Sequence, residues 1–234
     1  MTKKGKVYLM PTILGESSLN MVIPQGVQDV VKDIRFFIVE NIKTTRRYLR
    51  NIDKTFPIDD ALFYELNKHT NLDEISKYLQ PVLDGNDIAV VSEAGCPGIA
   101  DPGADIVKIA HEKRIKVVPL VGPSSMFLAL MASGLNGQNF AFHGYLSKDK
   151  SERIQQLKRL DNQAKYSAQL FMDTPFRNMQ LLEDVLTHCS KEIKLCIACD
   201  ITTPSEMITT KTIAEWREHV PNLNKRPCVF ILGC

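Results

Sequence analysis

SEAGCPGIADPG, residues Ser92 to Gly103, directly follows the short apolar run Ile88–Val91. Its glycines and prolines fix unusual backbone angles and let main-chain groups approach a ligand closely. An amphipathic segment comes next, so the pattern predicts a strand, then a rigid turn, then a helix. Open α/β sheets bind small molecules at the carboxyl ends of their strands. We therefore expect an α/β fold with a ligand site at this turn.

The same alternation of apolar runs and amphipathic segments extends in both directions from this turn, which favours α/β architecture with mainly parallel sheets. We expect strands at 7–10, 36–39, 61–64, 88–91 and 117–120, and then at 140–144, 168–172, 193–199 and 228–232. Helices are expected at 22–32, 44–51, 72–83, 104–113, 150–165 and 178–189, and a further one runs from a serine N-cap after Gly122-Pro123 to Ser133. The pattern restarts after Gly122-Pro123-Ser124-Ser125, so we predict two α/β domains, 1–121 and 122–234, with a ligand cleft between them.

Charge composition gives no global sign of nucleic-acid binding. The 234 residues carry 29 Lys and Arg against 27 Asp and Glu, a formal net charge of +2. An RNA-binding role would therefore depend on local patches. Two groups of basic residues are candidates. The first shares a predicted helix face and consists of Lys43, Arg46, Arg47 and Arg50. The second follows the 140–144 strand and consists of Lys148, Lys150, Arg153, Lys158 and Arg159. Charged helix faces are also often simply solvated.

The six cysteines show no regular disulfide spacing, which indicates reduced thiols in a cytoplasmic protein. Cys196 and Cys199 form a C-x-x-C pair, but they lie in a strand-like run without a partner pair. We interpret them as packing residues and expect no metal site. The chain shows neither a signal peptide nor a membrane-spanning helix.

Three more loops lie beside predicted strand ends, at residues 11–16, 121–125 and 171–177. Backbone donors at the start of the helix after Gly122 are suited to a carboxylate or a ribose. Each loop is also compatible with an ordinary turn or helix cap.

Together these loops carry a resemblance. PTILGE (11–16), VSEAGCPGIADPG (91–103), VVPLVGPSS (117–125), ASGL (132–135), FHGY (142–145) and MDTPFR (172–177) occur in the order and spacing of the tetrapyrrole methylase superfamily. They resemble most closely the branch that methylates a cytidine ribose 2′-hydroxyl in small-subunit ribosomal RNA. The resemblance implies two α/β domains, S-adenosylmethionine in the cleft between them, and a homodimer. It does not include the helical tail of that branch.

Motif matching also implies the cofactor contacts. They are Leu14, Ser92, Glu93, Gly95, Cys96, Ser124, Ser125, Asp173 and Pro227. Turn backbones and short side chains suit a compactly folded cofactor, while a carboxylate binds a ribose hydroxyl or an ammonium group. Glu93 is equally compatible with a solvated loop.

On the acceptor side, a ribose hydroxyl is a poor nucleophile and needs a general base or a strong hydrogen-bond acceptor. The branch carries a Glu-Asp-Thr-Arg string after its second strand, where this chain has Glu40-Asn41-Ile42-Lys43. Lysine cannot reproduce a bidentate guanidinium fork. The candidate catalytic residues are Glu40, Lys43 and His69, although a lone histidine is more often structural.

The sequence thus favours an S-adenosylmethionine-dependent methyltransferase that acts on ribosomal RNA or the small ribosomal subunit. Two alternatives keep the cofactor: methylation of a tetrapyrrole or another small molecule, and a binding module without catalysis. A nucleotide-binding oxidoreductase is disfavoured because no G-x-G-x-x-G follows the first strand, where Met10-Pro11-Thr12-Ile13-Leu14-Gly15 stands.

Overall fold

The computed structural model describes residues 4–66, 70–101 and 103–234. The chain forms two compact units, the first ending at Ser124 and the second running from Ser125 to Cys234. The sequence pattern placed this boundary between Val121 and Gly122. Within the described residues, no helix is both long and apolar enough to span a membrane.

The first unit is built on a five-stranded sheet in which all paired neighbours are parallel. Its order is β3 (Leu62–Glu65), β2 (Phe36–Val39), β4 (Ile88–Val91), β1 (Lys6–Met10) and β5 (Lys116–Pro119). The predicted strands β2 and β4 are confirmed residue for residue, and β3 and β5 lie one position from their predicted bounds. β4 is buried along its whole length because it is a central strand covered on both faces.

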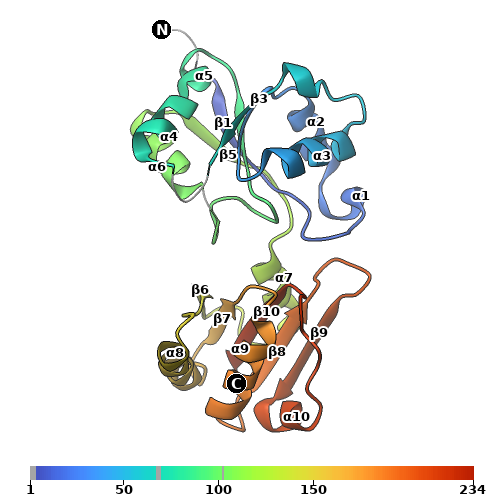
Figure 1. Ribbon diagram of the computed structural model, residues 1–234, viewed down its shortest axis with the longest axis vertical. Coiled ribbons are helices and arrows are strands. Elements are labelled where there is room, and N and C mark those ends of the chain that lie inside the picture. Colours follow the sequence, from blue (N-terminus) through green and yellow to red (C-terminus); the bar gives the residue numbers. More distant parts are fainter. Residues whose placement is uncertain (1–3, 67–69, 102) are drawn as a thin grey trace. The chain divides into compact units, whose positions relative to one another are not determined.

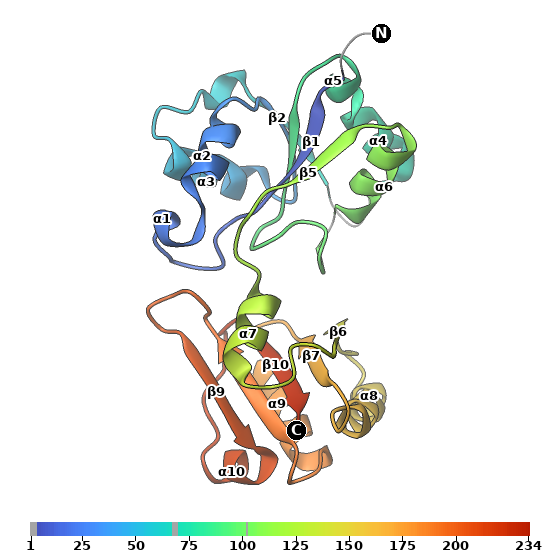
Figure 2. The ribbon, with the colours of Figure 1, turned by 180° about the vertical axis from the view of Figure 1, so that it is seen from behind.

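Helices cover both faces of this sheet (Figures 1 and 2). On one face lie α1 (Leu19–Val22), α2 (Gln25–Lys32), α3 (Ile42–Ile52) and the 3₁₀ helix η1 (Ile58–Asp60); on the other lie α4 (Leu72–Tyr78), α5 (Gln80–Leu83) and α6 (Ala104–Glu112). Side chains alternate between the two faces along each strand. Phe37 and Val39 therefore pack under α2 and α3, whereas Ile38 packs under α4 and α6.

Two predicted helices are each interrupted at or near a proline. The 22–32 segment breaks at Pro24, which separates α1 from α2, and the 72–83 segment breaks at Leu79, two residues before Pro81. Proline has no backbone N–H, and it disfavours helical geometry in the residue before it. Periodicity alone did not reveal these breaks.

The strand order creates a switch point between β1 and β4. The chain leaves β1 toward β2 on the α2 face, and it leaves β4 toward β5 on the α6 face. In open α/β sheets such a reversal opens a crevice at the carboxyl ends of the two strands. The loops that begin at Pro11 and Ser92 lie at this crevice.

The second unit contains a mixed sheet, which corrects the expectation of a mainly parallel one. Its order is β6 (Phe140–Tyr145), β7 (Ala168–Met172), β10 (Cys228–Gly233), β8 (Lys194–Cys199) and β9 (Met207–Thr212). Only β6 and β7 pair in parallel, and β10 runs antiparallel to both of its neighbours. An apolar run predicts a strand but carries no information about the direction of its partner.

Helix α7 (Ser125–Ser133) contacts β8, β9 and β10, and α8 (Lys150–Gln163), α9 (Asn178–His188) and α10 (Ile213–Glu218) pack together over one sheet face. Figures 1 and 2 show α7 and α9 on opposite faces. The predicted end of α7 at Ser133 is confirmed. The sequence missed β9 and α10. Every residue of β9 is half-buried, and its MITTKT composition has no apolar run.

Residues of this unit that the sequence suggested as a basic patch and as a C-x-x-C pair have structural roles. Arg153, expected in a basic surface group, is buried on α8 and forms a 2.7 Å ion pair with Asp184 of α9. Cys196 and Cys199 are buried in β8, and the Cys199 Sγ lies 2.9 Å from the Cys228 Sγ on β10. Among the described residues, no group of three or more metal-ligating side chains comes together.

Candidate functional site

The loops after β1 and β4 are joined by backbone pairing at the switch point. The Thr12 N–H donates to the Gly95 carbonyl at 2.9 Å, and the Thr12 hydroxyl donates to the Ser92 carbonyl at 3.3 Å. Both residues at the base of this contact, Thr12 and Ser92, are buried. The two strand ends therefore form one rigid surface.

Gly95 is packed between three loops. Its φ is +75°, and a Cβ added there would lie 3.1 Å from Leu14 Cδ2 and 3.4 Å from the Pro123 carbonyl oxygen. The Cys96 Sγ also lies 3.4 Å from that oxygen, and burial raises the pKa of its thiol. The loops after β1, β4 and β5 thus meet here.

Gly122 brings the loop after β5 against the loop after β1. A Cβ on Gly122 would lie 2.2 Å from the Pro11 Cβ, closer than side-chain contacts allow. The position therefore requires glycine for close approach. Of the four loops predicted from their strand-end positions, the three that follow β1, β4 and β5 come together in the fold.

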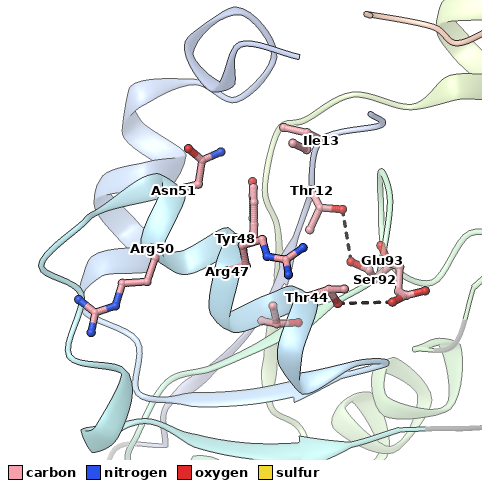
Figure 3. A pocket seen from close by; sticks show the side chains of 10 residues that line it. Thr12, Ile13, Thr44, Arg47, Tyr48, Arg50, Asn51, Ser92 and Glu93 are labelled. Carbon is pink, nitrogen blue, oxygen red and sulfur yellow. Dashed lines mark hydrogen bonds between the residues drawn. The ribbon is translucent and has the colours of Figure 1, made fainter. Parts of the chain in front are cut away.

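A cavity of about 440 Å³ opens between α3 and the loops after β1 and β4, and we name it the α3 pocket (Figure 3). Its lining residues come from three segments: Thr12 and Ile13; Thr44, Thr45, Arg47, Tyr48, Arg50 and Asn51; and Ser92 and Glu93. The Tyr48 hydroxyl donates to the Pro11 carbonyl at 3.0 Å, and this bond fixes α3 against the loop after β1.

The altered string Glu40-Asn41-Ile42-Lys43 has a clear local structure. The Asn41 side chain caps α3, accepting hydrogen bonds from the N–H groups of Lys43 and Thr44 at 3.0 and 3.2 Å. Asparagine and aspartate are similarly effective at this position. The exchange of acid for amide therefore preserves the start of α3. Lys43 lies in the first turn of α3 and is exposed.

Glu40, directly after β2, lies beside a second carboxylate. Its Oε1 accepts from the backbone N–H of Glu93 at 3.4 Å. Burial raises the pKa of Glu40 to about 7, and the nearby charges of Asp101 and Glu93 add to this rise, while the backbone hydrogen bond opposes it. Glu40 therefore changes its protonation state near neutral pH.

The predicted cofactor contacts fall into two groups. Leu14, Ser92, Glu93, Gly95, Cys96 and Ser124 belong to the first unit, and the five before Ser124 lie in the loops after β1 and β4. Ser125, Asp173 and Pro227 belong to the second unit. Asp173 is buried there and forms an ion pair with Arg177. As cofactor contacts, all nine residues stay predictions of the resemblance.

Of the two candidate catalytic residues that the structure describes, Glu40 contacts a residue of the pocket lining, the Glu93 backbone. His69 lies outside the described residues. The sequence missed Thr44, Tyr48 and Asn51, although their spacing in a predicted helix places them on one face together with Arg47. The basic residues of this helix indicated a charged surface, so its polar residues were not predicted to line a pocket.

Comparison with known proteins identifies the family. The sequence profile of the tetrapyrrole (corrin/porphyrin) methylases matches residues 26–216. The chain belongs to this family. It is similar to proteins named ribosomal RNA small subunit methyltransferase I: it is 30% identical to that of Synechocystis sp. over 98% of this chain and 79% of the relative, and 28% identical to that of Escherichia coli O157:H7 over 98% and 78%. The family and these relatives show that the protein is a methyltransferase.

Solved structures support the fold assignment of this methylase. The methyltransferase CobJ matches with a TM-score of 0.65 and 19% identity, covering 98% of this chain and 94% of CobJ. The cobalt precorrin-4 methyltransferase CbiF matches with a TM-score of 0.62 and 12% identity, covering 97% and 94%. At this identity the likeness shows a shared fold.

Proposed function

We propose that this methylase transfers a methyl group from S-adenosylmethionine to a ribose 2′-hydroxyl of small-subunit ribosomal RNA in the cytoplasm. The similarity to small-subunit methyltransferases covers nearly the whole chain, which supports this acceptor. The motif strings of the sequence resemble the 2′-O-ribose branch. The observation that carries the proposed chemistry is the position of Glu40, a half-buried carboxylate beside the α3 pocket lining.

The loops at the switch point fit the cofactor. They present backbone groups, a glycine at φ +75° and the short side chains of Ser92 and Cys96 around Leu14. We assign cofactor binding in the first unit to these residues, and we place Glu93, which lines the α3 pocket, on the acceptor side. When bound, S-adenosylmethionine supplies a methyl group that its sulfonium already activates. The protein then has to position the acceptor and accept its proton.

Glu40 is the proposed proton acceptor. A general base works best when its pKa lies near the working pH, and that of Glu40 is raised to about 7. Glu40 would take the hydroxyl proton as the methyl carbon leaves the sulfonium sulfur for the ribose oxygen, with the thioether as leaving group, and it would later release the proton to solvent. The Glu93 N–H holds the carboxylate in place from the end of β4.

Methyl transfer to native subunits tests this function. Small ribosomal subunits from a strain deleted for this protein would be incubated with the methylase and radiolabelled S-adenosylmethionine, followed by nucleoside mapping. We expect label on a single 2′-O-methylated nucleoside. Cofactor binding by calorimetry without labelled RNA would overturn the RNA acceptor. It would favour a small-molecule acceptor, or a binding module if no small acceptor is methylated either.

We also propose that the methylase forms a homodimer, as the family resemblance implies. The second unit exposes large apolar side chains on α7 and β6, with Phe127, Met131 and Phe140 exposed by 51%, 79% and 38%. Exposed apolar patches often mark protein interfaces. Light scattering coupled to size exclusion should give twice the 26.4 kDa chain mass. The chain mass itself would contradict the dimer.

A further inference from the structure

We propose that the α3 pocket is a nucleotide subsite, in which Arg47 binds an RNA phosphate and the Glu93 end receives the ribose hydroxyls. This inference rests on the proposed function, because it gives the RNA acceptor a defined binding position. The cavity of about 440 Å³ lies within the size range of small-molecule sites, roughly 300–1,000 Å³.

Among the described residues, Arg47 is the arginine of α3 that has neither an ion pair nor a hydrogen bond. Arg46 pairs with Asp59 at 3.4 Å and its guanidinium lies 6.0 Å from the Phe63 ring centre, while Arg50 donates to the Lys54 carbonyl at 2.6 Å. In the part of the chain that the structure describes, Arg47 makes no ion pair. A guanidinium without a carboxylate partner is suited to a phosphate, which it binds through two parallel hydrogen bonds.

The orientation of the side chains supports this assignment. Figure 3 shows the Arg47 guanidinium on the side of Thr12 and Glu93, whereas that of Arg50 points away from them. Arg47 is exposed, so it keeps its charge accessible to a ligand. Arg47 and Arg50 both line the pocket, but within the described chain only Arg47 points toward Thr12 and Glu93 and has no hydrogen-bond partner.

Neutral groups complete the pocket. Thr12, Thr44 and Asn51 offer hydroxyl and amide groups, and Ile13 adds an apolar surface. Tyr48 is buried and its hydroxyl is bonded to Pro11, so this residue forms part of the cavity wall. Polar groups that bond the sugar are usual contacts to unpaired RNA.

The charges give the pocket a direction. Glu93 repels a phosphate but accepts hydrogen bonds from hydroxyls, and the Thr44 hydroxyl already donates to its Oε1 at 3.4 Å. The phosphate therefore belongs at the Arg47 end and the ribose at the Glu93 end. Because Glu40 contacts the Glu93 backbone, this direction brings the ribose hydroxyls toward Glu40.

The test compares Arg47→Ala with Arg46→Ala, a matched control with the same charge change one residue away on the same helix. Methyl transfer to small subunits would be measured at several NaCl concentrations and constant Mg²⁺. For each lost phosphate contact, the slope of log kcat/KM against log salt should flatten by about 0.7 to 0.9. We expect this for Arg47→Ala, with a KM increase of about tenfold or more, and an unchanged slope for Arg46→Ala.

Arg47→Lys separates charge from shape. It should restore most of the salt slope but only part of the KM, since an ammonium lacks the guanidinium fork. Equal slopes and KM values for Arg47→Ala and Arg46→Ala, with an active wild-type protein, would overturn the subsite alone. Failure of the wild-type protein to methylate any subunit would instead overturn the proposed function on which the subsite rests.

Discussion

The Glu40 carboxylate accepts a hydrogen bond from the backbone N–H of Glu93, with 3.4 Å between Oε1 and N. This bond joins the carboxyl ends of β2 and β4, which are neighbours in the sheet. It holds a half-buried acid beside a second acid, and the pKa of Glu40 rises to about 7 because of burial and the charges of Asp101 and Glu93. The site therefore contains a group that exchanges a proton near neutral pH.

Glu40→Gln should lower kcat for methyl transfer by about 10²–10⁴-fold, the usual contribution of a general base. In the wild-type protein, kcat/KM should rise with pH and level off above about 7, because the base acts only when deprotonated. Glu65→Gln is a matched control, since this exposed acid ends the neighbouring strand β3. An equal loss in both variants would argue against a specific role for Glu40.

The same substitution should change the pH dependence of stability. The folded protein holds the Glu40 proton more tightly than the unfolded chain, in which the pKa of this carboxyl is 4.5. The free energy of unfolding should therefore decrease as the pH rises from about 4.5 to about 7, and this contribution should then stay constant. Glu40→Gln removes it, so the variant should gain stability relative to wild type across that range. Urea unfolding at several pH values measures the difference, and a constant difference would contradict the raised pKa.

Asn41→Ala should destabilise the first unit by about 1 kcal/mol through loss of the α3 cap. Asn41→Asp should stay within a few tenths of a kcal/mol of wild type, because a carboxylate accepts the same two N–H groups. Urea unfolding followed by circular dichroism distinguishes them. If both variants lose the same stability, the cap is not the important property of this residue.

Gly95→Ala should weaken S-adenosylmethionine binding by about tenfold, roughly 1.4 kcal/mol, because the new Cβ displaces Leu14 or the Pro123 carbonyl. Gly134→Ala is the control: its φ is +70°, but its Cβ would meet no atom within 4 Å. Both variants should lose about 1–2 kcal/mol of stability from the left-handed backbone. Calorimetric titration with the cofactor should separate them, and equal affinities would remove Gly95 from the site.

Arg153→Met should destabilise the second unit by about 3–5 kcal/mol, because it leaves Asp184 buried without its partner. Adding Asp184→Leu should recover most of this loss, since an apolar pair of similar volume replaces the ion pair. Trp216, the one tryptophan of the chain, is buried in the same unit and reports its unfolding by fluorescence. A double variant as unstable as the single one would contradict this explanation.

Much of the first unit was predictable because its signals are local. Ile88–Val91 is an uninterrupted apolar run followed by a glycine- and proline-rich turn, and it forms the central strand β4. The limits were also local in origin. Pro24 and Pro81 interrupt apolar periodicities that otherwise read as continuous helices, and β9 lacked an apolar run because it is a half-buried edge strand.

The α/β class, the strand ends and the loops that follow them could be predicted from the sequence alone. Apolar periodicity and turn residues act over a few neighbouring positions. Which of the adjacent Arg46 and Arg47 side chains is free to bind a ligand depends on the tertiary structure. Asp59 and Phe63 occupy Arg46, and the α3 pocket leaves Arg47 unpaired within the described chain. The raised pKa of Glu40 also depends on the tertiary structure, since this carboxylate is buried, and comes near Asp101 and Glu93, only when β2 and β4 pair in the sheet.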